Sequence, residues 1–448
     1  MNRRRLLFPI VIAALATLPG LYLRLSGYMH RILPERIPGE ELNPALISPQ
    51  VVVVAIIAGI AILGASFLLL WACDAVQMDI SQTLALAVVA LIAVLPEYAV
   101  DMYFTWQAGQ EFPMVGDNAH FAIANMTGAN RLLIGVAWVV IVVIFWVRTR
   151  RPVVLEKERR TELFFLGLAT LYAFFIPIKG SLAWYDAIVF LTLYVWYIVI
   201  AGRRPCAECE AEGPAELLIS LPKIKRRLAT LAMFVFAASV ILANAEPFSE
   251  GLVATGEKAG IESFLLVQWL APIASEAPEF IVAIMFALRR QAGLALGSLL
   301  SSKLNQWTLL VGMIPLVFGI SSRQFATPIP MDSFQMHEIL LTAAQSLMAV
   351  VMLAPLQLSI GQAALLFTLF IGQFLSPVVT MLFPKLDAKA WSGDRLHQFF
   401  SGVYMIISLG IFLRHPGRVA GLWEGMKFEP VCAADEETEE REKEPVSV

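Results

Sequence analysis

Long apolar stretches separated by short polar segments dominate the chain. Stretches long enough to cross about 30 Å of hydrocarbon predict about twelve membrane-spanning helices, at 6–25, 50–73, 81–107, 118–147, 161–178, 183–201, 228–245, 262–289, 293–320, 336–354, 360–383 and 398–414. These runs are unbroken, whereas the strands of a membrane barrel alternate lipid-facing and lumen-facing residues over about ten positions. The pattern therefore predicts an all-α, polytopic membrane helical bundle.

The composition and the loops support a membrane protein and suggest its orientation. Hydrophobic residues make up 58% of the 448 residues, and the mean hydropathy is +0.71, which no water-soluble domain of this size needs. Lys and Arg concentrate in alternate connections, whereas the intervening ones, such as 108–117 and 246–262, are acidic or mixed. By the positive-inside bias, the basic connections and both termini are expected on the cytoplasmic side of a cell (inner) membrane.

Three segments need separate interpretation. The first window follows a basic triplet and is either a signal peptide or a span; its length, Pro9 and Pro19 favour an uncleaved span. The tail, 421–448, is acidic and expected to be disordered. Cys206 and Cys209 have metal-ligand spacing, but a structural zinc takes four ligands and no others lie nearby in the sequence, so an ordinary loop pair is favoured.

Two Pro-Glu dipeptides lie inside predicted spans, where a proline and a carboxylate are both costly. They are Pro96-Glu97 and Pro278-Glu279, and each is followed by a helix rich in small, amide and hydroxyl residues. Each proline lacks an N–H, so the carbonyl four residues earlier loses its helical partner. A freed carbonyl beside a carboxylate is a ligand pair for a hard cation.

The two copies are predicted to run in opposite directions. By the charge assignment, 81–107 runs outward and 262–289 runs inward. Inverted repeats bring equivalent helices together near the bilayer midplane, where secondary transporters bind their substrate. A single copy is equally compatible with a kink and a structural ion pair, but the duplication favours an ion or proton pathway.

The repeats suggest how the chain is divided. Each repeat is expected to contain five helices. The predicted segments are an N-terminal span and outer loop (1–49), a first repeat (50–201), a cytoplasmic loop (202–227), a second repeat (228–385), a C-terminal span (386–420) and the acidic tail (421–448).

The paired motifs resemble the cation/calcium antiporter superfamily, that is, the sodium/calcium exchanger membrane region. That family carries GTSLPE on one helix and GN-x-x-GSN-x-x-N or -D on the next, in two inverted copies. Here the copies read IAVLPE (92–97) with ANMTGANRLL (124–133), and ASEAPE (274–279) with GSLLSSKLNQ (297–306). The resemblance covers about 50–385 and leaves the first and last spans as additions to the family's usual ten.

The resemblance implies that Glu97 and Glu279 are the central calcium ligands. Further motif positions fall in copy two on Ser275, Glu276, Ser302 and Gln306, and in copy one on Ala93, Val94, Ala129 and Leu133. Copy one thus loses several sodium-type ligands, and copy two gains a third carboxylate. Since Glu276 shares a helix face with Glu279, the two acids are expected to share a cation, or one of them holds a proton.

Other polar residues in the motifs have two readings each. Lys303, at the motif's Asn position, is a candidate counter-charge for Glu276 or Glu279, or it snorkels to an interface. Asp101, one turn after Glu97, either extends the pathway or lies at its outer mouth. The remaining candidates either add neutral ligand oxygens or join helices by hydrogen bonds; they are Asn125, Asn130, Ser298 and Asn305.

The resemblance implies a secondary active antiporter that exchanges Ca²⁺ for Na⁺ or H⁺ by alternating access. It implies no resident cofactor, and only small inorganic cations and the lipid bilayer as partners, with no nucleic acid. The alternatives are a proton-coupled exchanger of another cation and a non-transporting scaffold. An intramembrane enzyme is disfavoured because the sequence lacks HExxH and GxSxG motifs. The sequence does not determine the oligomeric state.

Overall fold

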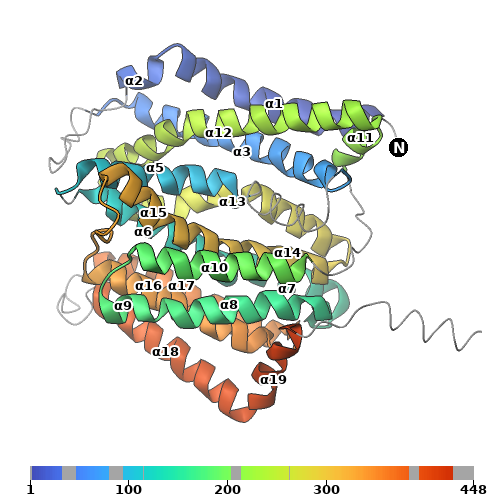
Figure 1. The fold of residues 1–448 in the computed structure, drawn as a ribbon, viewed down its shortest axis with the longest axis vertical. Coiled ribbons are helices and arrows are strands. Elements are labelled where there is room, and N and C mark those ends of the chain that lie inside the picture. The colour runs from blue at the N-terminus through green and yellow to red at the C-terminus, as the bar shows by residue number, and fades with distance from the viewer. Residues whose placement is uncertain are drawn as a thin grey trace, which may run out of the picture.

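The computed structural model describes residues 3–32, 47–79, 94–114, 116–202, 213–261, 263–382 and 393–426. In these residues the ordered elements are helices, apart from the two-residue strands β1 (Val153–Val154) and β2 (Gln357–Leu358). The long helices lie side by side with their axes running across the view in Figure 1. The prediction of an all-α membrane bundle is confirmed.

Ten helices in the described part of the chain are long and apolar enough to cross a membrane. Two further predicted spans correspond to α5 (Leu95–Glu111) and α17 (Ile360–Leu382). The other principal helices are α1 (Arg3–Leu25), α3 (Gln50–Val76), α6 (Asp117–Leu132), α7 (Trp138–Thr149), α8 (Arg160–Ala173), α10 (Trp184–Ala201), α12 (Lys223–Ala259), α13 (Ser263–Leu288), α14 (Ala292–Asn305), α15 (Val311–Ser322), α16 (Ser333–Leu353) and α18 (Gly393–Arg414).

Shorter elements complete the chain. The π-helices η1 (Leu133–Ala137) and η3 (Gln306–Leu310) join α6 to α7 and α14 to α15. The remaining helical pieces are α2 (Tyr28–Ile32), η2 (Lys157–Arg159), α9 (Phe175–Lys179), α11 (Ala215–Ile219), α19 (Pro416–Ala420) and η4 (Gly421–Met426). Several expectations lie outside the described residues: those for Ile92 and Ala93, for the Cys206 and Cys209 loop, and for the tail from 427 onward.

One predicted boundary is wrong. Hydropathy places the end of a span at residue 245 and an outer loop at 246–262, but α12 continues to Ala259 with Pro247 inside it. Glu250 in this extension is buried, and the hydroxyl of Tyr103 donates a hydrogen bond to it at 2.9 Å. Glu246 in the same extension forms an ion pair with Arg24 of α1 at 2.8 Å. The first acidic residues after the apolar run therefore find partners on neighbouring helices, and the helix persists because these contacts satisfy them.

Helices α3 and α12 form a long antiparallel pair at one end of the bundle (Figure 1). At one end of the pair, Arg226 on α12 donates to Asp79 just after α3 at 2.7 Å. At the other end, the Lys258 ammonium donates to the Ile47 carbonyl at 2.6 Å. These two helices occupy the same place in the two predicted repeats, so their opposite directions agree with an inverted arrangement.

The connections between helices show the same reciprocity. β1 follows α7 and pairs with β2, which follows α16, through Val153 and Leu358. A second bridge joins Leu182, which precedes α10, to Ile329, which follows α15. In the first contact, the loop before α8 pairs with the loop after α16. In the second, the loop before α16 pairs with the loop that leads from α8 and α9 to α10. Because α8 and α16 occupy the same place in the two predicted repeats, exchanging the repeats turns one contact into the other. The exact boundaries of the two repeats stay predictions.

The terminal helices pack against the central ones. A Cβ on Gly64 of α3 would lie 2.6 Å from the Ala13 carbonyl, so α1 approaches α3 closely. At the opposite end of the bundle, α18 packs along α16 (Figure 1). Both helices are therefore parts of the packed bundle.

The contact between α6 and α13 depends on a glycine. Pro272 inside α13 cannot donate to the Gln268 carbonyl, and this carbonyl faces Gly128 on α6. A Cβ added to Gly128 would overlap with that carbonyl oxygen. The small residue therefore permits the two backbones to approach, as small residues commonly do between membrane helices.

The variant Gly128→Ala is expected to destabilise the bundle, because overpacking in a well-packed interior costs about 1–3 kcal/mol. The matched control is Gly402→Ala on α18, where an added Cβ meets nothing within 4 Å. Melting temperatures of the two detergent-solubilised proteins test the contact. A melting temperature of Gly128→Ala equal to that of Gly402→Ala would show that the close approach is absent.

The ion pair at the end of α3 makes stability depend on pH. Hydrogen bonds from Arg226 and then Arg227 lower the pKa of Asp79 from its ordinary value to about 2. A depressed carboxyl pKa stabilises the fold above the unfolded-state pKa, about 3.9, and this contribution disappears as the pH falls towards 2. The melting temperature of Asp79→Asn should thus lie below that of the parent at pH 6, and the difference should shrink below pH 4. A constant difference from pH 6 to pH 3 would contradict this assignment.

Candidate cation-binding centre

The two Pro-Glu dipeptides occupy different positions in their helices. Pro278 lies inside α13, as predicted. Pro96 lies in the first turn of α5, whose described helix begins at Leu95, and not in a helix interior. The first turn tolerates proline because its N–H would lack a helical partner anyway. Glu97 is thereby placed at a helix N-terminus, where the macrodipole favours negative charge.

Three carboxyl groups from the two copies meet in the interior. Glu97 and Glu276 are each 2% exposed, and Glu279 is half-buried. Glu97 lies within hydrogen-bonding reach of both Glu276 and Gln306, and within electrostatic range of Glu279. The structure therefore brings together the acids that the sequence places 182 positions apart (Glu97 and Glu279).

Residues of α14 and η3 hold two of these carboxylates. The Gln306 amide donates a hydrogen bond to Glu276, and the Ser302 hydroxyl donates to Glu279 at 3.0 Å. The Ser275 hydroxyl instead donates to the Ala271 carbonyl of its own helix at 3.2 Å. It lies one residue from Glu276 and keeps lone pairs as an acceptor.

Lys303 is fully buried but does not form an ion pair with the described acids. Its ammonium donates to the Asn130 side-chain oxygen at 2.6 Å and lies 4.7 Å from the Trp307 ring centroid. Snorkelling is excluded because the side chain is 0% exposed. Glu276 and Glu97 lie within electrostatic range of this ammonium but not in direct contact with it, so its role as their counter-charge stays a prediction. Lys303 and Asn130 occupy the same motif position in the two copies.

The other candidates divide into two groups. The Asn125 amide donates to Asp101 at 3.3 Å, which joins α6 to α5 beside Glu97. Both side chains are buried, as is Asn305. Ser298, one turn before Ser302, is exposed, and the structure gives it no contact with the carboxylates.

Several buried oxygens around these acids have no hydrogen-bond partner among the described residues. They are Glu97 Oε1, Asp101 Oδ2, Asn125 Oδ1, Glu276 Oε2, Asn305 Oδ1 and Gln306 Oε1. Buried polar atoms are nearly always satisfied, so such a group calls for water or an ion. All six are oxygens, the atoms that hard cations prefer. Among the described residues, no group of three or more His, Cys, Asp or Glu side chains is arranged to hold a metal ion.

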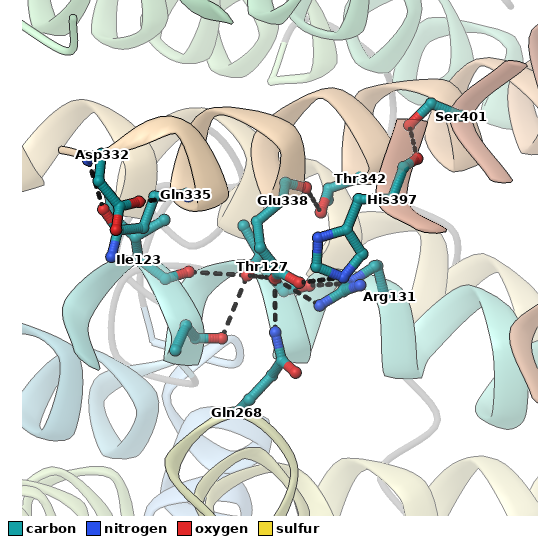
Figure 2. A network of polar contacts seen from close by, with 11 residues as sticks. Ile123, Thr127, Arg131, Gln268, Asp332, Gln335, Glu338, Thr342, His397 and Ser401 are labelled. Atoms are coloured by element: carbon teal, nitrogen blue, oxygen red, sulfur yellow. Dashed lines mark hydrogen bonds and ion pairs between the residues drawn. The ribbon is translucent and has the colours of Figure 1, made fainter. Parts of the chain in front are cut away.

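A second buried network was missed by sequence reasoning (Figure 2). Glu338 on α16 forms an ion pair with Arg131 on α6 at 2.6 Å, and both side chains are nearly unexposed. Arg131 and Glu338 lie inside the predicted spans 118–147 and 336–354, and an ionisable residue inside a span is itself a sign of function. What the sequence could not show is that these two residues, from distant spans, are partners.

Buried acids and oxygens without partners among the described residues, inside an integral membrane helical bundle, are typical of secondary ion transporters. The model of the sodium/calcium exchanger protein family matches residues 50–202 and 229–377. The chain therefore belongs to the sodium/calcium exchanger family, and the resemblance expected from its motifs is confirmed.

The chain is also similar to solved structures. The crystal structure of the H⁺/Ca²⁺ exchanger CAX is 39% identical in sequence, with a TM-score of 0.82, and the match covers 94% of this chain and 98% of that one. A structure of the sodium-calcium exchanger NCX_Mj is 17% identical, with a TM-score of 0.49, and the match covers 72% of this chain and 97% of that one. No curated protein sequence matches the chain.

Proposed function

We propose that the protein is a secondary active antiporter that exchanges Ca²⁺ for H⁺ at the centre built by Glu97, Glu276 and Glu279. The observation that carries the proposal is the group of buried oxygens without partners beside these acids. Carboxylate and amide oxygens are the ligands of Ca²⁺. Family membership and the 39% identity to an H⁺/Ca²⁺ exchanger support the same cargo.

Coupling follows from the charge of the centre. Three carboxylates face one nearby ammonium, that of Lys303, in an interior where uncompensated charge costs several kcal/mol per ion. Either Ca²⁺ or protons neutralise the acids, and both use the same oxygens, so the two cargoes compete. The protein changes the side to which the centre opens when the centre is neutralised and not when it is bare.

The departures from the family motif favour protons over Na⁺. Val94, Ala129 and Leu133 stand in copy one where the motif has hydroxyl, amide or carboxylate ligands. Apolar side chains cannot coordinate Na⁺, whereas the added carboxylate of Glu276 can accept a proton. The second hypothesis is an exchanger of Ca²⁺ for Na⁺ (the sodium reading), or of another cation for H⁺. The third is a non-transporting scaffold (the scaffold reading).

The orientation is part of the proposal. Lys and Arg concentrate in alternate connections, which places both termini in the cytoplasm of a cell (inner) membrane. Efflux then moves Ca²⁺ out of the cytoplasm as protons enter. The relatives are transporters, and the proposed reaction breaks no covalent bond.

The variants Glu97→Gln and Glu279→Gln are expected to lower Ca²⁺ flux in proteoliposomes by at least about tenfold each, since metal sites respond on that scale even to outer-shell changes. Glutamine keeps the shape and removes the charge. The matched control, Glu216→Gln on α11, lies outside the membrane-spanning helices and should transport like the parent. Parental flux from both site variants would refute the centre.

The counter-ion is tested with the parent protein alone. Proteoliposomes loaded with Ca²⁺ should release it when an inward proton gradient is imposed, and a pH dye should report proton entry that accompanies the release. An equal Na⁺ gradient at constant pH should give no release beyond that of empty vesicles. Release with Na⁺ and not with a proton gradient would select the sodium reading, and no release with either would support the scaffold reading.

A further inference from the structure

Glu338 collects donors from three neighbouring helices (Figure 2). Arg131 and Thr127 of α6 donate to its Oε2 atom at 2.6 and 2.9 Å, and the Gln268 amide of α13 donates to the same atom. His397 of α18 lies 3.0 Å from its Oε1 atom. Glu338 is 1% exposed, so the four contacts replace the hydration that this carboxylate would have in water.

The pair with Arg131 is costly to break. Arg131 is 2% exposed and has further contacts with the Thr127 carbonyl at 3.4 Å and the Trp269 ring at 5.0 Å. Neither contact supplies negative charge. Removing one partner of a buried ion pair leaves the other uncompensated, which is much worse than lacking both. Glu338 is therefore what keeps the charge of Arg131 balanced.

Arg131 lies next to the proposed transport centre. Its neighbour Asn130 accepts the hydrogen bond from Lys303 at 2.6 Å, and Arg131 itself acts on Lys303 through space. Lys303 in turn acts on Glu276 and Glu97. The described charged and titratable groups around the pair are thus His397 on α18, Tyr404 on α18 and Lys303 on α14.

The same carboxylate also fixes the two helices that carry the centre. Gln268, which donates to Glu338, is the residue whose carbonyl contacts Gly128 of α6. Gly128 lies in the same helix as Asn125 and Asn130, and Gln268 lies in the same helix as Glu276. Glu338 therefore ties α6 to α13 near a close approach of their backbones.

From these contacts we infer that Glu338 is a positioning residue of the transport centre, which sets its Ca²⁺ affinity by neutralising and anchoring Arg131. The inference rests on the proposed function, since it takes Ca²⁺ as the cargo. With Glu338 neutral, Arg131 leaves a net positive charge beside Lys303, and this charge opposes the entry of a divalent cation. His397 recruits the terminal helix α18, which lies beyond the residues matched by the family model, to the same anchor.

The test compares Glu338→Gln with the double variant Arg131→Gln/Glu338→Gln in Ca²⁺ uptake by proteoliposomes. The single variant should raise the KM for Ca²⁺ by at least about tenfold, because outer-shell partners of a metal site commonly contribute 10–100-fold. The double variant removes both charges and should return KM to within about threefold of the parent, the scatter usual for context effects. A purely structural role would lower the amount of folded protein and the maximal rate, and the double variant would not restore KM.

Two controls make the result decisive. His337→Ala, which removes a contact with Gln398 at the exposed surface beside Glu338, should leave KM unchanged. If Glu338→Gln does not fold, Glu338→Asp, which keeps the charge, should have a KM close to that of the parent, and Arg131→Gln, which leaves no positive charge at this place, should not raise KM. Parental KM in Glu338→Gln, or a double variant as impaired as the single, overturns this inference alone. A parent that neither transports Ca²⁺ nor is stabilised by it against heat overturns the proposed function and this inference together.

Discussion

The cost of placing charge in hydrocarbon governs this protein. A buried carboxylate in a membrane persists only when cations or donors offset it, and two of the places in the described bundle where this occurs bear on transport. In one, Glu338 is offset permanently by Arg131 and three further contacts. In the other, Glu97, Glu276 and Glu279 keep oxygens without partners among the described residues. The first arrangement is a fixed structural contact, and the second leaves room for an exchangeable cargo.

The packing of α5, α6 and α13 brings Glu97, Glu276 and Glu279 close together. Proline removes backbone hydrogen bonds in α13, and the freed Gln268 carbonyl is accommodated by Gly128 rather than by a donor. On the other side, α5 begins at Leu95, so Glu97 enters the centre from a helix end. The glutamate of the first copy therefore lies in the first turn of a helix, and that of the second copy lies inside a helix. This difference in local structure agrees with the different motif sequences of the two copies.

The hydrogen bond between Lys303 and Asn130 explains how a lysine is accommodated at a motif position that is usually an asparagine. Lys303 replaces an amide found in the family motif, and its partner Asn130 occupies the same position in the other copy. A cation of the protein itself thus lies where the motif has a neutral ligand. In the proposed function, this substitution would reduce the number of mobile cations that the centre needs for neutrality, in keeping with the proton as the proposed second cargo.

Much of the fold was decided by the sequence alone, because hydropathy is a local property. The apolar runs predict the spans, and the duplicated Pro-Glu motif makes Glu97 and Glu279 the predicted central ligands. The extension of α12 to Ala259, the contact of Lys303 with Asn130, and the network around Glu338 were decided only by tertiary structure. Each depends on which distant residue satisfies a buried polar group, and that choice is made when helices pack, not by the pattern along any one of them.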